Sequence, residues 1–384
     1  MTTPPPPRSS RGRRHQANAF TGIVLAGRYR LVEVVGVGGT GAVYRAERLA
    51  AGERVAVKLL HPDAEGFALL AMRMEREALA GAALRHPNIA SALDFGVLAD
   101  NTRFLVTEFV AGRTLRDFMR KGPVPLERAI AIATELTEAL RACHDKGVVH
   151  RDLKPLNVMI DEEAGGTVKL IDFGLARIPA RTLDRKPVAE DEASTLQNLT
   201  LHGLVFGTVA YMAPETAKGM AAVDERSDLY ALGVVIYELM TGVHPFSAED
   251  PVDLFLQHRL TIPPSMRERA PAVVVPAPLE AIVMRLMAKR PEARFASAAA
   301  VLAALRAMPA AGEPRTRPAM ATPLVAVLPS AEPPPPAPAS VYRSWAWVSR
   351  RETTPPSRSR RSHARCAPRR SARPIRAPRA SKPR

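Results

Sequence analysis

The amino-acid sequence predicts an α+β fold with two lobes, in which a small strand-rich lobe precedes a larger helical lobe and a disordered tail lies at each end. Short valine-rich segments at 29–37, 42–48 and 53–60 are separated by glycines, which is typical of strands. After Gly122 the chain changes to longer segments with apolar residues about one helical turn apart. The order of these two patterns predicts the two lobes.

The small lobe is predicted to contain one helix and two further strands. Residues 66–84 have apolar side chains roughly one turn apart, which predicts a helix. Strand-like runs follow at 89–96 and 103–110.

In the large lobe the apolar-periodic segments predict three helices. The first covers 126–146 and ends at Gly147, a residue that commonly terminates helices. The others are expected at 226–241 and 296–307.

These patterns place one domain at 26–308, with a small lobe at about 26–110 and a large lobe at about 111–308. The tails, 1–25 and 309–384, are rich in proline and arginine and poor in large apolar residues. Such segments cannot bury enough apolar surface to offset the entropy lost on ordering. We therefore expect both tails to be disordered.

The net charge of +16 comes from the ends of the chain. Residues 1–20 and 313–384 carry the excess of arginine, whereas 21–312 is nearly neutral. The basic C-terminal tail could bind nucleic acid or an acidic partner through counterion release. A solvated linker is the alternative, since the segment 350–384 has no aromatic residue that could stack on bases.

Cysteine content and hydropathy indicate a soluble, cytoplasmic protein. The two cysteines, Cys143 and Cys366, argue against a disulfide framework. The N-terminus lacks the apolar core of a secretory signal. The uncharged stretch 318–331 contains three prolines and is shorter than the roughly 20 residues of a spanning helix. We therefore expect no membrane span.

A glycine-rich segment, GVGGTG at 36–41, lies between two strand-like runs. Glycines there would let backbone N–H groups approach phosphate oxygens without a side chain in the way. A dinucleotide-binding fold is an alternative, but its glycines lead into a helix, and 42–46 is strand-like. A plain hairpin is the other alternative.

A lysine follows at the end of the apolar strand, in the segment VAVK at 55–58. Lys58 would place an ammonium beside phosphates held by the glycines. A carboxylate on the predicted helix would hold the lysine in one rotamer. Glu77 is our preferred partner, and Glu75 is the alternative at a different helical angle.

Together these features resemble the small lobe of the eukaryotic-type (Hanks-type) serine/threonine protein kinases, in a bacterial-like form. The large lobe adds HRDLKPLN at 150–157, DFG at 172–174 and APE at 213–215. The ordered motifs cover about 29–307. The resemblance implies a bilobal protein-kinase fold.

The resemblance also implies the roles of individual residues. Asp152 would orient the substrate hydroxyl, and Lys154 would contact the transferring γ-phosphoryl group. Asn157 and Asp172 would supply oxygen ligands for Mg²⁺, with Mn²⁺ as an alternative. The residues expected to bind ATP or to support its binding are Val35, Gly36, Val37, Gly38, Gly39, Thr40, Gly41, Ala42, Val43, Lys58, Glu77, Glu108 and Val110.

The implied substrates are protein serine and threonine hydroxyls, because the segment around Lys154 resembles that of serine/threonine kinases. Thr208 supports this, since its hydroxyl could bridge Asp152 and Lys154. Thr107 falls where the family places the residue that guards the back of the adenine pocket.

Regulation by phosphorylation is implied as well. In the family an arginine at the position of Arg151 pairs with a phosphate on the activation segment, which here corresponds to residues 172–215. Among Thr182, Ser194, Thr195 and Thr200 we favour Thr200 as the autophosphorylated residue. The alternative is that Arg151 binds backbone carbonyl groups.

The segment HRDLKPLN at 150–157 corresponds to the catalytic loop of the family. Buried supports are expected around this loop. Glu215 would pair with Arg294, and Asp228 would accept backbone hydrogen bonds from the loop. His150 and Phe173 would pack beneath it.

Two other function classes compete with a kinase. A pseudokinase scaffold would be expected to lack Lys58, Asp152 or Asp172, and all three are present. A small-molecule phosphotransferase would generally lack the APE element at 213–215.

Overall fold

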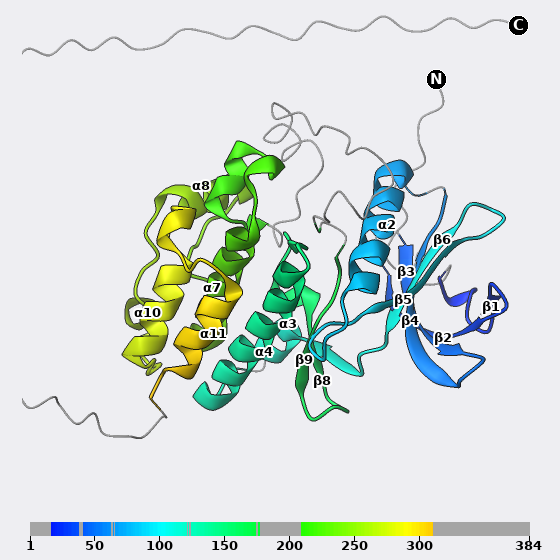
Figure 1. Cartoon of the computed structure of the whole chain (residues 1–384), viewed down its shortest axis with the longest axis horizontal. Coiled ribbons are helices and arrows are strands. Elements are labelled where there is room, and N and C mark those ends of the chain that lie inside the picture. Colours follow the sequence, from blue (N-terminus) through cyan, green and yellow to red (C-terminus); the bar gives the residue numbers. More distant parts are fainter. Residues whose placement is uncertain are drawn as a thin grey trace, which may run out of the picture. The chain divides into compact units, whose positions relative to one another are not determined.

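A computed structural model describes residues 17–37, 41–62, 64, 66–120, 122, 124–173, 176 and 209–309, which fold into two lobes (Figure 1). The small lobe contains β1 (Val24–Leu25), β2 (Tyr29–Val37), β3 (Gly41–Arg48), β4 (Glu53–Leu60), α2 (Phe67–Ala83), β5 (Ala92–Val97) and β6 (Arg103–Glu108). The large lobe contains β7 (Gly112–Thr114), α3 (Leu115–Met119), α4 (Leu126–Asp145), β8 (Val158–Asp161), β9 (Thr167–Leu170), α7 (Glu225–Thr241), α8 (Pro251–Leu260), α9 (Met266–Arg269), α10 (Ala277–Leu286) and α11 (Ala298–Arg306). The predicted fold class is confirmed.

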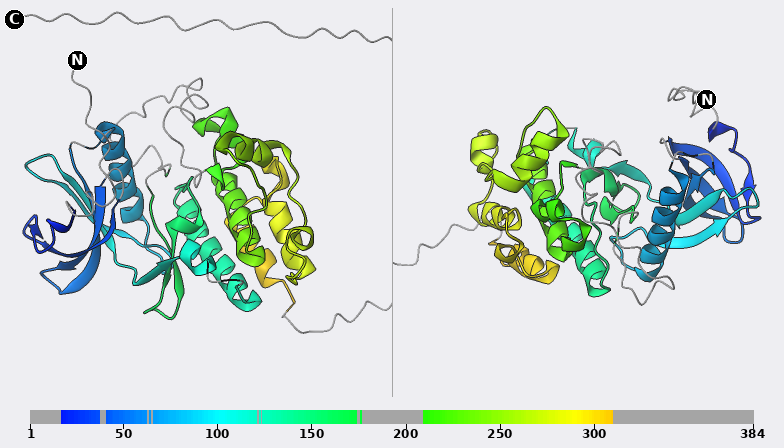
Figure 2. Two further views of the ribbon diagram at one scale, coloured as in Figure 1. Left: turned by 180° about the vertical axis from the view of Figure 1, so that it is seen from behind. Right: turned by 90° about the horizontal axis from the view of Figure 1, so that it is seen from above.

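The small lobe is built on an antiparallel sheet with strand order β1-β2-β3-β4-β6-β5. Successive side chains of a strand point to opposite faces. In β4, Val55, Val57 and Leu59 are buried in a cluster with Tyr44 on one face. Lys58 therefore points to the other face, where it pairs with Glu77 of α2. Figures 1 and 2 show α2 lying beside this sheet.

The predicted strand at 89–96 is wrong in its first residues. The strand β5 begins at Ala92, because the preceding backbone pairs with the large lobe instead. Ile89 forms a parallel bridge with Leu170, and the Ala90 amide donates to the Leu170 carbonyl at 3.0 Å. The strand β6 likewise ends at Glu108, two residues before the predicted end.

The predicted N-terminal tail is wrong for residues 17–25, because these residues pack on the small lobe. Ala17 is buried, and its carbonyl accepts a hydrogen bond from the Tyr44 hydroxyl at 3.0 Å. Residues 24–25 form β1, which pairs with β2. Residues 1–16 and 310–384 lie outside the described part of the chain.

The predicted helices of the large lobe are confirmed, with ends shifted by one or two residues. The central helix is α7, in which every residue from Ser227 to Thr241 except Glu238 is buried. It contacts both α4 and α10. Within the described ranges, no helix has the length and apolar character needed to span a bilayer.

A glycine sets the close approach of α7 and α10. A Cβ atom added at Gly233 would lie 2.7 Å from the Leu286 Cβ and 2.9 Å from the Met287 Cγ. Both neighbours are completely buried. The helices must therefore move apart to accommodate any side chain at this position.

We predict that Gly233→Val lowers the free energy of unfolding by about 1–3 kcal/mol through overpacking. Urea denaturation of the full chain measures this change. The matched control is Ala303→Val on the exposed face of α11, which should leave the midpoint almost unchanged. Equal midpoints for the wild type and Gly233→Val would show that this contact does not limit the packing.

Candidate active site

A cleft of about 240 Å³ lies between the lobes. Apolar side chains from both lobes line it, which suits a planar aromatic ring. The lining residues are Val35, Val43, Ala56, Lys58, Glu77, Gly81, Ala90, Ala92, Leu105, Thr107, Glu108, Phe109, Val110, Met159, Ile171, Asp172 and Phe173. Of the residues predicted to bind ATP, the cleft therefore brings together Val35, Val43, Lys58, Glu77, Glu108 and Val110.

The glycine-rich segment connects two antiparallel strands, β2 and β3. Gly36 pairs with Val43, and Val37 pairs with Ala42. A Cβ atom at Gly41 would lie 2.0 Å from the Leu59 carbonyl oxygen, so only glycine fits there. Because a strand follows the glycines, the dinucleotide-binding alternative is wrong. The predicted ligands Gly38, Gly39 and Thr40 lie outside the described residues.

Lys58 and Glu77 form an ion pair at 2.8 Å between Nζ and Oε2. The Glu77 side chain is 8% exposed, whereas Glu75 is on the exposed face of α2. Asp172 Oδ1 lies 3.9 Å from the same ammonium, which links the two lobes. The structure therefore selects Glu77 over Glu75 as the partner of the lysine.

Burial and the neighbouring charges act in opposite directions on the pKa of Lys58, whereas burial determines the direction for Glu77. Burial raises the pKa of Glu77 to about 7, with the nearby Asp172 carboxylate adding to the rise and Lys58 opposing it. For Lys58, burial favours the neutral amine, but the carboxylates of Glu77 and Asp172 outweigh it and raise the pKa. The ammonium therefore stays charged while Glu77 titrates near neutrality.

The catalytic loop brings its predicted residues Asp152, Lys154 and Asn157 into contact with one another. Lys154 Nζ donates to Asp152 Oδ2 at 2.7 Å. The side-chain amide of Asn157 donates to the same oxygen at 3.0 Å and to the backbone carbonyl of Asp152 at 2.8 Å. The backbone carbonyl of Asn157 accepts a hydrogen bond from the backbone amide of Ile171 at 2.9 Å. This bond joins the loop to the segment that carries Asp172.

A buried carboxylate holds the loop in place, as predicted. Asp228 accepts hydrogen bonds from the backbone amides of His150 and Arg151 at 2.8 Å each. The His144 ring lies 2.9 Å from it. Burial tends to raise the pKa of Asp228, but the hydrogen bonds from His144 and the Arg151 amide hold it below its ordinary value.

Left-handed backbone occurs at two positions of the site, Arg151 with φ 66° and Asp172 with φ 64°. Such conformations are unfavourable for residues with a side chain and persist where the surroundings enforce them. Asp228 holds Arg151 in this conformation by accepting a hydrogen bond from its backbone amide. Beneath the loop, His150 and Phe173 pack edge to face at 5.0 Å between ring centroids, as predicted.

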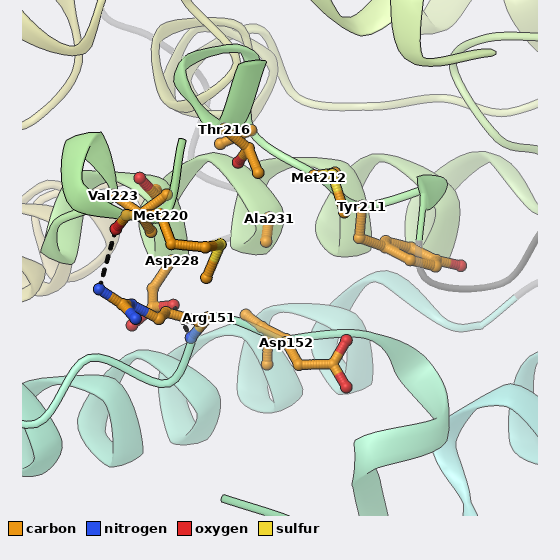
Figure 3. A pocket seen from close by; sticks show the side chains of 12 residues that line it. Arg151, Asp152, Tyr211, Met212, Thr216, Met220, Val223, Asp228 and Ala231 are labelled. Atoms are coloured by element: carbon orange, nitrogen blue, oxygen red, sulfur yellow. Dashed lines mark hydrogen bonds between the residues drawn. The ribbon is translucent and has the colours of Figure 1, made fainter. Parts of the chain in front are cut away.

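Arg151 lines a second, small pocket together with Asp152 and residues of α7 such as Asp228 (Figure 3). Its guanidinium donates to the Met220 carbonyl at 3.0 Å. This contact corresponds to the alternative in which Arg151 binds a backbone carbonyl group instead of a phosphate. The favoured phosphorylation site, Thr200, and the bridging Thr208 lie outside the described residues.

The predicted ion pair between Glu215 and Arg294 is confirmed. Two parallel hydrogen bonds of 2.7 Å join the guanidinium to the carboxylate, and both side chains are buried. Burial tends to raise the pKa of Glu215, but Arg294 and Ser227 outweigh it and lower the value. The pair fixes the APE segment to the end of the large lobe.

Several supporting residues could not have been recognised in the sequence. Lys169 Nζ contacts Glu108 at 2.9 Å, so an ion pair from β9 holds the segment that connects the lobes. Glu135 accepts from the Asn88 side chain at 3.3 Å and from the Val168 amide at 2.6 Å. No short motif marks these positions, because only the folded path brings them together.

The donor set fits a divalent ion bound jointly with phosphate. Asn157 and Asp172 offer hard oxygen atoms of the kind that Mg²⁺ prefers. Within the described ranges, no cluster of three or more histidine, cysteine or acidic residues could hold a metal on its own. Mg²⁺ commonly uses one or two protein groups and completes its shell with phosphate and water.

Two lobes around a cleft, with a lysine, a loop that carries an aspartate and a pair of oxygen donors, form the architecture of a protein kinase domain. The chain belongs to the protein kinase domain family, which it matches over residues 29–304.

Bacterial serine/threonine kinases are among its relatives. Serine/threonine-protein kinase pkn2 of Myxococcus xanthus is 40% identical over 293 residues, which covers 75% of this chain and 34% of the relative. Pkn3 of the same organism is 37% identical over 292 residues, covering 75% and 51%. PknB of Mycobacterium leprae is 39% identical over 287 residues, covering 73% and 43%. The chain spans from about a third to about half of the length of these curated relatives.

A solved structure of another kinase domain agrees with this family assignment. The kinase domain of a mutant of Mycobacterium tuberculosis PknI superposes with a TM-score of 0.53 at 26% identity. The match covers 74% of this chain and 97% of that domain.

We predict that nucleotide affinity depends on the ionisation of Glu77. Below its raised pKa of about 7 the neutral carboxyl group holds Lys58 less firmly, because the charge attraction is lost, so affinity for an ATP analogue should fall about tenfold from about pH 8 to about pH 5.5. Stability should change in the opposite direction, because a carboxyl group with a raised native pKa destabilises the fold as pH rises towards that value. Calorimetric titration and thermal unfolding over this range measure both.

The variant Glu77→Gln should bind the analogue more weakly and show only the pH dependence that comes from the analogue's own phosphates. Glu75→Gln, on the exposed face of the same helix, is the matched control and should follow the wild type. Parallel pH profiles for the wild type and Glu77→Gln would contradict this assignment.

Proposed function

We propose that this chain is a serine/threonine protein kinase that transfers the γ-phosphoryl group of ATP to hydroxyl groups of protein substrates, including its own. A continuous set of contacts across the cleft supports this most strongly. The Lys58 ammonium lies 3.9 Å from the Asp172 carboxylate, and the backbone amide of Ile171 donates to the backbone carbonyl of Asn157. Asn157 and Lys154 both donate to Asp152. These groups can therefore act on one phosphate chain.

The proposed position of the nucleotide follows from the shape and charge of the cleft. The adenine ring would lie between apolar residues such as Val43 and Met159, with its edge at the backbone of Glu108 and Val110. The glycine-rich turn would cover the phosphates. Lys58, held by Glu77, would then neutralise their charge.

In the transfer step, the substrate hydroxyl oxygen attacks the γ-phosphorus while the bond to the bridging oxygen of ADP breaks. Asp152 would accept the hydroxyl proton, and Lys154 would balance the charge on the transferring group. Asn157 and Asp172 would hold Mg²⁺, or Mn²⁺ in its place. When bound, the ion neutralises the negative charge of the phosphates.

Serine and threonine acceptors are proposed because the printed relatives are serine/threonine kinases and because Lys154 follows the catalytic aspartate by two residues. The scaffold alternative is disfavoured by the intact contacts of Lys58 and Asp172. The small-molecule alternative is disfavoured by the APE segment, which Arg294 anchors.

The remaining proposals concern partners and compartment. The arginine-rich tail beyond residue 313 is proposed to bind nucleic acid or an acidic protein, with a solvated linker as the alternative. A cytoplasmic location is proposed from the low cysteine content, since the described cysteine, Cys143, is buried with a free thiol.

We predict that Asp152→Asn lowers phosphoryl transfer by at least about 100-fold, because the substrate hydroxyl loses its proton acceptor. Affinity for Mg-ATP should change little. Autophosphorylation with labelled ATP, followed by mass spectrometry of the labelled residues, measures the transfer and its acceptors. Asp145→Asn, on an exposed aspartate at the end of α4, is the control. A folded wild type that binds nucleotide without transferring phosphate would favour the scaffold.

We predict that Thr200→Ala lowers kinase activity several-fold and leaves ATP affinity mostly intact, because Arg151 would lose a phosphate partner. Initial rates with a generic protein substrate and separate nucleotide titrations measure the two quantities. Thr182→Ala, elsewhere in the same segment, is the control. Unchanged turnover in Thr200→Ala would refute the role of this threonine and favour the contact of Arg151 with the Met220 carbonyl.

A further inference from the structure

The segment 209–213, which comes just before the short helix Pro214–Lys218, lies beside the proposed catalytic aspartate. Tyr211, Met212 and Ala213 line the small pocket that Asp152 and Leu153 line from the catalytic loop (Figure 3). A protein whose hydroxyl group reaches Asp152 must therefore lie close to this segment. The position of the segment then affects how well a protein substrate binds.

His244, in the loop after α7, contacts the backbone of this segment. Its Nε2 lies 2.7 Å from the carbonyl oxygen of Ala210. Its Nδ1 lies 2.8 Å from the carbonyl oxygen of Phe246 and 3.2 Å from the backbone nitrogen of the same residue. Because Nδ1 can accept from the Phe246 amide, the neutral ring carries its proton on Nε2. His244 therefore donates a hydrogen bond to the Ala210 carbonyl.

The same imidazole also packs on the next residue of the segment. The rings of His244 and Tyr211 meet edge to face, with 5.8 Å between their centroids and an interplanar angle of 89°. Tyr211 is only 5% exposed, and its hydroxyl donates to the Glu238 carboxylate of α7. The segment is thus held at two adjacent residues, through the carbonyl of Ala210 and through the side chain of Tyr211.

A buried aromatic cluster fixes the position of the His244 ring. The His258 ring of α8 packs against it at 5.6 Å between centroids, and Phe246 packs on His258 at 4.9 Å. The Tyr230 hydroxyl lies 2.9 Å from His258 Nδ1. Burial, together with His244 and Lys289, lowers the pKa of His258 to about 3, so this ring is neutral near pH 7. His244 therefore lies between a fixed, uncharged neighbour and the segment it holds.

We propose that His244 is a positioning residue for the protein substrate, which holds the segment 209–213 beside the catalytic loop through the Ala210 carbonyl and the Tyr211 ring. This inference rests on the proposed function, since the segment needs a fixed position only if a protein binds to it. The nucleotide cleft is lined by neither His244 nor any residue of 209–213. Loss of the imidazole should therefore affect the protein substrate and leave ATP binding unchanged.

Steady-state transfer of labelled phosphate from ATP to the full-length Asp152→Asn chain, used as the protein substrate, tests this role. We expect His244→Leu, which cannot donate to Ala210, to raise the KM for this substrate at least about fivefold. The KM for ATP and the kcat should stay within about twofold of the wild type, because the interaction contributes to substrate binding and not to the transfer step. Thermal unfolding checks that each variant is folded.

Two amide variants separate positioning from a merely structural role. His244→Gln carries an N–H donor near the position of Nε2 and should restore the KM to within about twofold of the wild type. His244→Asn has a shorter side chain that cannot reach the Ala210 carbonyl, so it should behave like His244→Leu. This comparison decides the question even if His244→Leu does not fold. Val243→Ala, at the neighbouring residue that is 40% exposed, is the control and should follow the wild type.

The outcomes distinguish this inference from the proposed function. An unchanged KM in His244→Leu and His244→Asn, a loss confined to kcat, or a His244→Gln variant no better than His244→Asn would overturn the role of His244 and leave the proposed function intact. A folded wild type that transfers no phosphate to the Asp152→Asn chain would overturn the proposed function, and this inference with it.

Discussion

The ion pair between Lys58 and Glu77, in contact with Asp172, is the constraint on which the rest of the site depends. A lysine has a long and mobile side chain, so it can be aimed at a phosphate only if a fixed carboxylate restrains it. Glu77 provides this restraint from a helix packed on the sheet. The third group, Asp172, belongs to the other lobe and lies 3.9 Å from the ammonium. The relative position of the lobes and the electrostatics of the site are therefore coupled.

The large lobe supplies the rigid frame for this arrangement. The catalytic loop contains no regular strand or long helix, and its shape is fixed by hydrogen bonds to Asp228 in α7, a helix that is buried over nearly its whole length. The ion pair between Glu215 and Arg294 fixes the APE segment to the same lobe. Buried charges of this kind are unfavourable unless each is fully paired. Their presence in α7 and its surroundings is best explained by the need to hold the loop.

The residues of the site could be predicted from the sequence because each belongs to a short contiguous segment in which the chemistry admits few residue types. Lys58, Asp152 and Asp172 are of this kind. The apolar lining, with Met159 and Ile171, could not be predicted, since such residues look like any other core position. The predicted start of the strand β5, at residue 89, was wrong for a related reason. The alternation of side chains continues through residues 89–91, but their backbone pairs with β9 of the other lobe. Contacts between distant segments leave no local pattern.

The central claim is that groups from both lobes act on a single nucleotide. A crystal structure of the full chain with Mg²⁺ and a non-hydrolysable ATP analogue tests it most directly. The account predicts that the phosphates lie between the Lys58 ammonium and the Asp172 carboxylate, with the metal ion held by Asp172 and Asn157 and the terminal phosphate facing Asp152. A nucleotide bound outside this cleft, or bound in it with its phosphates directed away from Lys58 and Asp152, would contradict the account.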